Sequence, residues 1–132
     1  MNATSEDIKD MIEAESALSL EFATNLFIGV EPKEPNDTVT IFDTPGGSPA
    51  LGLTSQGYEY PSIQIRARNL NYLTGWNLME SIKTLFHGRA QETWNGTLYS
   101  VIYVANGPAM LDRDDNGRFR FIINLNIQRR AV

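Results

Sequence analysis

The sequence predicts an α+β domain with a mainly antiparallel β-sheet and two helices packed on one face of it. Two segments, 60–68 and 118–129, alternate apolar and polar side chains, as strands with one buried face do. Between residues 76 and 86, apolar side chains recur every three or four positions, as in an amphipathic helix. Asn95-Gly96 lies between two β-rich runs and indicates a tight hairpin, which joins antiparallel neighbours.

Length and composition suit one domain spanning residues 1–132. The net charge of −5 argues against a general nucleic-acid binder, which would carry a basic surface. The chain has no cysteine, which excludes disulfides and thiolate sites. The first residues are polar and acidic, and no apolar run reaches the ~20 residues of a membrane span. We therefore expect synthesis in a reducing cytoplasm.

The first third of the chain is predicted to form one helix and two strands. The helix covers residues 4–18, with Thr4 or Ser5 as its N-terminal cap. The apolar runs 23–30 and 38–43 are interpreted as strands. Between them, residues 31–37 contain two prolines and four charges, which is typical of a loop.

A long loop is predicted over residues 44–57, which contain four glycines, two prolines and no charge. Loops of this length inside a compact domain are usually functional or mobile. The apolar side chains of Ala50, Leu51 and Leu53 make this loop a candidate for docking on a partner. A hairpin loop lying on its own domain is an equally good interpretation of the same residues.

Residues 60–88 are predicted to organise the core as a strand, a short turn and one long helix. Asn69 or Asn71 can cap the helix, and Gly88 is placed to end it. The residues expected in the core are Ile63, Ile65, Trp76, Ile82 and Phe86.

The last third is predicted to contain a hairpin, a connection and a final strand. The hairpin pairs 91–94 with 97–105, residues 106–117 connect, and 118–129 form the strand. In the second hairpin strand we expect Tyr99, Val101 and Tyr103 to face away from Leu98, Ile102 and Val104. The polar face of the sheet is predicted to carry Gln64, Arg66, Arg68, Arg118, Arg120, Asn124 and Asn126. This face is either simply solvated or a contact surface.

Motifs with known chemistry are incomplete in this chain. Asp43-Thr-Pro-Gly46 matches the DxxG switch motif of GTPases, but no phosphate-binding loop accompanies it. Residues 112–117 match the first half of a calcium loop, yet Ile123 occupies the position of its bidentate glutamate. An acidic turn is the simpler interpretation, and weak calcium binding stays open. His87 is the single histidine, so a zinc or Ser-His-Asp site is not expected. We predict no catalytic, cofactor-binding or metal residues.

Several segments together resemble the small tail-terminator or minor-capsid (tail-completion) family of long-tailed bacteriophages. The resemblance covers residues 26–129. It is carried by LFIGVEPKEPNDTVTIFDTPGGSP, YEYPSIQIRARN, a helix ending in LFHG, and DRDDNGRFRFIINLNIQR.

The resemblance implies an α+β structural protein of the virion without enzymatic activity, made in the host cytoplasm. Members of the family are similar to proteins that form a hexameric ring on the tail tube, stop its polymerisation and meet the head–tail connector. The implied partners are further copies of the chain, the tail tube protein, the connector protein, and DNA that crosses the lumen without sequence-specific binding. The loop 44–57 would dock on a neighbour or on the tube. The lumen would be lined by Arg66, Arg68, Arg118 and Arg120.

Two alternatives remain at this stage. The first is another head–tail neck or completion protein. The second is a small ligand-binding or enzymatic α+β domain that uses Asp43 and the acidic turn Asp112–Asp115.

Overall fold

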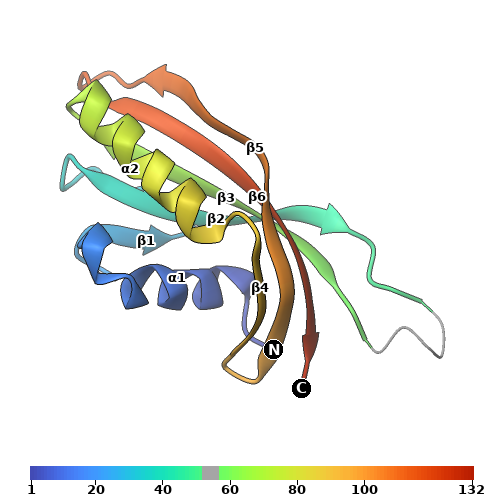
Figure 1. Ribbon diagram of the computed structural model, residues 1–132. Coiled ribbons are helices and arrows are strands. Elements are labelled where there is room, and N and C mark those ends of the chain that lie inside the picture. The colour runs from blue at the N-terminus through green and yellow to red at the C-terminus, as the bar shows by residue number, and fades with distance from the viewer. Residues whose placement is uncertain (52–56) are drawn as a thin grey trace.

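The computed structural model describes residues 1–51 and 57–132, and it confirms the α+β class (Figure 1). One six-stranded sheet has the order β1-β2-β3-β6-β5-β4. β1 pairs with β2 in parallel, and the other neighbours are antiparallel. The elements are α1 (Thr4–Ala14), the 3₁₀ turn η1 (Ser16–Leu18), β1 (Leu26–Ile28), β2 (Thr38–Gly47), β3 (Tyr60–Asn69), α2 (Tyr72–Phe86), β4 (Arg89–Trp94), β5 (Thr97–Arg113) and β6 (Phe119–Ala131).

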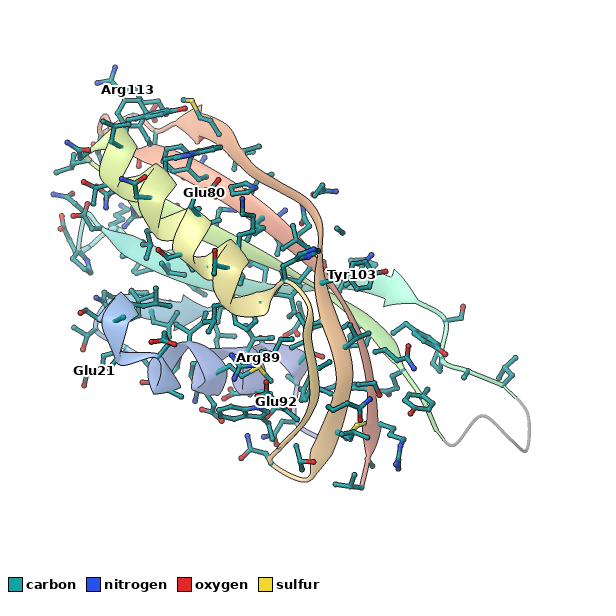
Figure 2. The ribbon with its side chains drawn as sticks, viewed as in Figure 1. Glu21, Glu80, Arg89, Glu92, Tyr103 and Arg113 are labelled. Atoms are coloured by element: carbon teal, nitrogen blue, oxygen red, sulfur yellow. The ribbon has the colours of Figure 1, made fainter. Side chains whose placement is uncertain are left out.

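Both helices cover the same face of the sheet. α2 packs on β3, β5 and β6, whereas α1 packs on β1, β2 and β3. Figure 1 shows α2 lying across the sheet with α1 below it. The outer side of this helical layer is polar, and Glu80 of α2 lies on it (Figure 2). Within the described residues, no helix combines the length and apolar character needed to cross a membrane.

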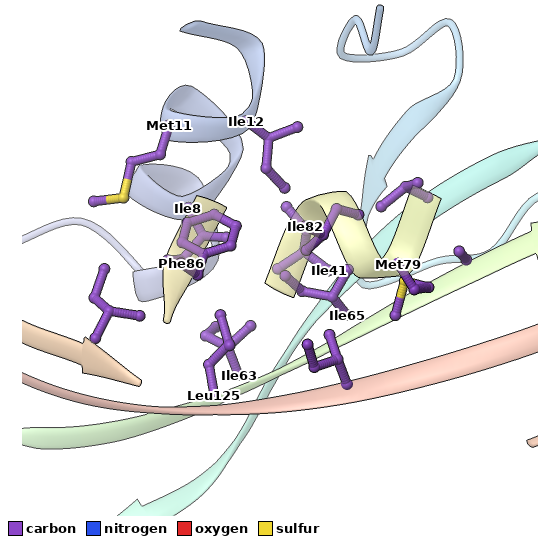
Figure 3. Packing of buried hydrophobic residues seen from close by; sticks show 14 of the residues in the cluster. Ile8, Met11, Ile12, Ile41, Ile63, Ile65, Met79, Ile82, Phe86 and Leu125 are labelled. Atoms are coloured by element: carbon purple, nitrogen blue, oxygen red, sulfur yellow. The ribbon is translucent and has the colours of Figure 1, made fainter. Parts of the chain in front are cut away.

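The core forms where β3 and β6 turn their apolar side chains toward the helices (Figure 3). In the antiparallel register, Ile63 faces Leu125 and Ile65 faces Ile123. Four of the five predicted core residues are completely buried, and only Trp76 is partly exposed at the edge of the cluster. The buried cluster consists of Ile8, Met11, Ile12, Leu26, Val39, Ile41, Ile63, Ile65, Ala67, Met79, Ile82, Phe86, Tyr99, Ile102, Phe121, Ile123, Leu125 and Ile127.

The start of α2 is defined by a side-chain cap and a close helix–sheet approach. The Asn71 side chain accepts the Thr74 N–H at 3.0 Å, which confirms one of the two predicted caps. A Cβ atom on Gly75 would lie 2.7 Å from Cε2 of Phe121, so a glycine lets the helix contact the sheet here. At the other end, α2 stops at Phe86, two residues before the predicted terminator Gly88.

The N-terminal elements are shorter than predicted. α1 ends at Ala14, and the rest of the predicted helix is the separate turn η1. The predicted cap at Thr4 or Ser5 was wrong, because both residues lie inside α1 and Ala3 occupies the cap position. The Ser5 N–H and Oγ–H instead donate to the carboxylate of Asp43 at 3.0 and 2.6 Å. β1 covers only three residues, since Ala23 and Gly29 on its two sides adopt positive φ angles of 68° and 76°.

Two segments predicted as connections are partly strand. β2 continues to Gly47, so the predicted loop 44–57 begins four residues too early. Gly46 permits this pairing, because a Cβ there would lie 2.1 Å from the backbone oxygen of Tyr60. The prediction of a connection over 106–117 was wrong, because β5 runs to Arg113 and only a short turn precedes β6.

A β-bulge explains a further error in β5. The register with β6 shifts between Tyr99 and Val101, which adds one residue to β5. Tyr99 and Ile102 are therefore both buried, although the alternation had placed them on opposite faces. Tyr103 points to the other face and is 43% exposed.

Two residues of α2 that have the same size, Ile82 and Leu73, should differ clearly in their contribution to stability. Ile82→Ala should lower the free energy of unfolding by about 2–5 kcal/mol, because it leaves a cavity beneath the helix. Leu73→Ala, at a position 67% exposed, should change it by less than about 0.5 kcal/mol. Urea denaturation measures both. Equal losses would mean that α2 does not cover the sheet through Ile82.

Candidate interaction surfaces

A two-stranded arm extends from the sheet and is the most prominent surface feature (Figure 1). We define the arm as residues 44–51 and 57–60. Gly47 pairs with Tyr60, and farther out the Ala50 N–H donates to the Tyr58 oxygen at 3.0 Å. The base is tied to β6, because Glu59 and Arg129 exchange two backbone hydrogen bonds, of 2.8 and 3.0 Å, and form an ion pair at 3.3 Å.

The arm carries two of the three apolar residues predicted to dock on a partner. Leu51 is 93% exposed and Ala50 is half-buried, whereas Leu53 lies outside the described residues. No charged residue occurs from Thr44 to Gly57. The exposed Leu51 on this uncharged stretch is the basis for treating the arm as a candidate docking surface.

The face of the sheet opposite the helices, which we call the reverse face, carries polar side chains from β3, β6 and β5. Its cross-strand hydrogen bonds include Ser62 Oγ–H to Asn126 at 2.8 Å and Gln64 Nε2–H to Asn124 at 3.3 Å. The register places four rows across the three strands: Ser62, Asn126 and Tyr103; Gln64, Asn124 and Asn106; Arg66, Ile122 and Ala109; Arg68, Arg120 and Asp112.

Residues 29–37 fold over the charged end of the reverse face and bury two of the four predicted lumen arginines. Arg68 donates to the carbonyl oxygens of Pro35 at 2.7 Å and Asn36 at 3.1 Å. Arg118 donates to the carbonyl oxygen of Lys33. Because Arg68 and Arg118 are only 3% and 5% exposed, they serve the packing of this loop and do not present charge at the surface.

Acidic side chains neutralise most of the remaining arginine charge. Glu31 Oε1 contacts both Arg68 at 3.4 Å and Arg120 at 3.2 Å. Hydrogen bonds from Arg120 hold the pKa of Asp112 below its ordinary value. Arg66 differs, because no ion pair within residues 1–51 and 57–132 reaches it. Its guanidinium donates to Gln64 at 2.9 Å and lies 4.8 Å from the centre of the Phe42 ring.

A ligand-binding or enzymatic domain would use Asp43 and the acidic turn Asp112–Asp115. The carboxylates of Asp43 and Asp114 instead accept hydrogen bonds from neighbouring parts of the protein. Asp43 accepts from Ser5, as described above. Asp114 Oδ1 accepts the N–H groups of Asn116 at 3.0 Å and Arg118 at 2.9 Å, which shapes the acidic turn. Burial acts to raise the pKa of Asp114, but the hydrogen bonds from Arg118 and Asn116 outweigh it and lower the pKa. Among the described residues, no three acidic, histidine or cysteine side chains are grouped as metal ligands.

The single histidine has a backbone partner. His87 Nδ1 accepts the Val104 N–H at 3.0 Å, just beyond the last residues of β5 that pair with β4. The side chain thus satisfies a strand-edge donor, which is a structural role.

A buried polar network was missed by sequence reasoning. Asp7 is completely buried and accepts hydrogen bonds from Tyr99 Oη–H and from Asn95 Nδ2–H at 2.7 Å. Arg129 donates to the same tyrosine oxygen at 3.3 Å. Burial and the adjacent Asp7 raise the pKa of Tyr99. The network joins α1, the β4–β5 turn and β6. Its only sequence signal was an aspartate next to the apolar stripe of the first helix.

Removing Glu31 should loosen the cover of the reverse face. Glu31→Ala leaves Arg68 buried without a carboxylate, and we expect a loss of about 3 kcal/mol in the free energy of unfolding. Lys33→Ala is the matched control in the same loop, because only the backbone oxygen of Lys33 contacts Arg118. Chemical denaturation of both variants tests this. A Glu31→Ala variant as stable as Lys33→Ala would contradict a role for the ion pairs in holding the loop.

Comparison with known proteins agrees with a structural role. The family model described as "Bacteriophage tail terminator protein" matches residues 5–130. A chain in the solved structure titled "Virion of native gene transfer agent (GTA) particle" has a similar fold, with a TM-score of 0.70. That similarity covers 98% of this chain and 96% of the other at 12% sequence identity. The comparison with the curated proteins finds no match. The extent of the family match shows that this chain belongs to the bacteriophage tail terminator family, the structural proteins of the tail end of the phage particle.

Proposed function

We propose that this protein forms a ring of identical subunits, six in number, on the end of the tail tube. There it stops tube polymerisation and provides the surface that meets the head–tail connector. The observation that carries this proposal is the family match over residues 5–130. A head–tail neck protein of another kind would use similar surfaces, but the family description favours the terminator.

The arm is suited to joining subunits of such a ring. A ring of identical subunits needs a heterologous contact, in which one patch of each subunit meets a different patch of the next. The described residues of the arm project from one side of the molecule and include the exposed Leu51, so the arm can reach a neighbouring subunit or the tube. Burial of a leucine side chain in such a contact contributes roughly 1.5–3 kcal/mol.

The reverse face is our candidate for the lumen that DNA crosses. Arg66 retains the least neutralised charge of the four predicted lining residues, and Arg120 is partly exposed beside it. A weakly positive wall attracts phosphates without reading bases. Because Glu31, Asp112 and Asp114 offset the other arginines, such a wall would hold DNA only weakly, as passage requires.

A charged side chain at position 51 of the arm should abolish assembly of the ring. Leu51→Asp places a carboxylate where we expect an apolar contact, so rings should be lost in native mass spectrometry and tails should become irregular in length. Leu73→Asp is the matched control, because that leucine is 67% exposed near the N-terminus of α2 and an acidic residue is favourable there. Rings of normal stability from Leu51→Asp would contradict arm docking.

Reversing the charge of Arg66, the least neutralised of the four arginines, should slow the passage of DNA. Phage carrying Arg66→Glu should assemble tails of normal length but release DNA more slowly after triggering, because phosphates are then repelled in the lumen. Lys33→Glu makes the same change of charge in the loop that covers the reverse face. Unchanged release kinetics for Arg66→Glu, measured by dye fluorescence of ejected DNA, would count against this placement of the lumen.

A further inference from the structure

The base of the arm borders a groove of about 360 Å³ on the reverse face. Its rim includes Gly47 and Tyr60 of the arm, and its far side comes from β5. Figure 2 shows Tyr103 where β5 passes the root of the arm. The residues lining the groove are Gly47, Tyr60, Ser62, Val101, Tyr103, Asn126, Ile127 and Gln128.

The lining of this groove has a definite chemical character. Tyr60 and Tyr103 are 38% and 43% exposed and contribute aromatic surface. Asn126 and Gln128 add amide donors and acceptors, and no charged side chain is present. Aromatic grooves of this kind bind extended, proline-containing segments, whose backbone is already restricted before binding.

The chain itself contains a segment with matching properties. Residues 45–51 of the arm read PGGSPAL, with two prolines, no charge and the exposed Leu51. With a net charge of −5, two copies repel each other over most of their surfaces. Residues 45–51 and the described residues that line the groove carry no charge, so these two surfaces can meet without this repulsion.

The arm of one subunit is poorly placed to fill its own groove. It starts at the rim of the groove and extends away from it, and the pairing of Glu59 with Arg129 fixes its base. From Gly47 to Leu51 an extended ribbon spans about 13 Å at ~3.3 Å per residue, so the tip lies well beyond the rim.

We propose that this groove receives the arm of a neighbouring copy, with Pro49 to Leu51 packed between Tyr60 and Tyr103. This inference rests on the proposed ring and names the surfaces that build it. The amides of Asn126 and Gln128 bind the backbone of the incoming arm. Because donor and acceptor surfaces are separated by the length of the arm, the contact is head-to-tail and closes into a ring.

The absence of cysteine allows a direct test by disulfide cross-linking. The double variant Leu51→Cys/Gln128→Cys should, on mild oxidation, give a ladder of covalent multimers that ends at the ring size. The control Leu51→Cys/Ser81→Cys places the second thiol on the exposed outer side of α2 and should stop at random dimers. Circular dichroism verifies that both variants fold. Each is tested in concentrated solution and on terminated tails.

The outcomes separate this inference from the function on which it rests. If the Leu51→Cys/Gln128→Cys variant forms rings or terminates tails but gives no selective cross-link, arm-to-groove docking is wrong. The proposed ring itself would still stand. Equal ladders from the two double variants would also overturn it. If wild-type protein fails to stop tube growth, the proposed function fails, whereas a selective ladder in solution would still support the docking of arm and groove.

Discussion

The pairing of β3 with β6 is the constraint on which the rest of the structure depends. With Ile63 opposite Leu125 and Ile65 opposite Ile123, the buried apolar side chains of the two central strands point to the helices, and Ile122 is an exception on the reverse face. A shift of one residue would exchange the two faces and expose the core. The same register gathers the polar residues on the reverse face, so core and contact surface are two results of one alignment.

The regular parts of this fold could be predicted from sequence, because β3, β6 and α2 keep a clear periodicity of apolar residues that is interrupted in β6 only at Ile122. β5 could not, since bulges after Tyr99 and Val104 break its alternation and make a long strand look like a strand followed by a loop. The apolar arm was found from Leu51 and the lack of charge. The burial of Arg68 and Arg118 was not, because their acceptors are backbone carbonyls, which carry no signature in the sequence.

The distribution of charge links fold to assembly. Arginines on the reverse face are matched by Glu31, Asp112 and Asp114, so this face is polar without being strongly basic. The helical layer carries acidic residues on its outer side, and the arm carries no charge between Thr44 and Gly57. This division of charge is the physical basis of the proposed contact between the arm of one subunit and the groove of the next.

The loop of residues 29–37, which covers one end of the reverse face, also affects how far the sequences of related proteins can diverge. The loop binds Arg68 and Arg118 through the backbone carbonyl oxygens of Lys33, Pro35 and Asn36. Every type of residue has such an oxygen. The side chains at these positions can therefore change while the loop keeps its place, provided that Arg68, Arg118 and the ion-pairing Glu31 are retained. The sequence of this loop can therefore change without rebuilding the sheet. The solved structure with a similar fold at 12% identity is consistent with such divergence.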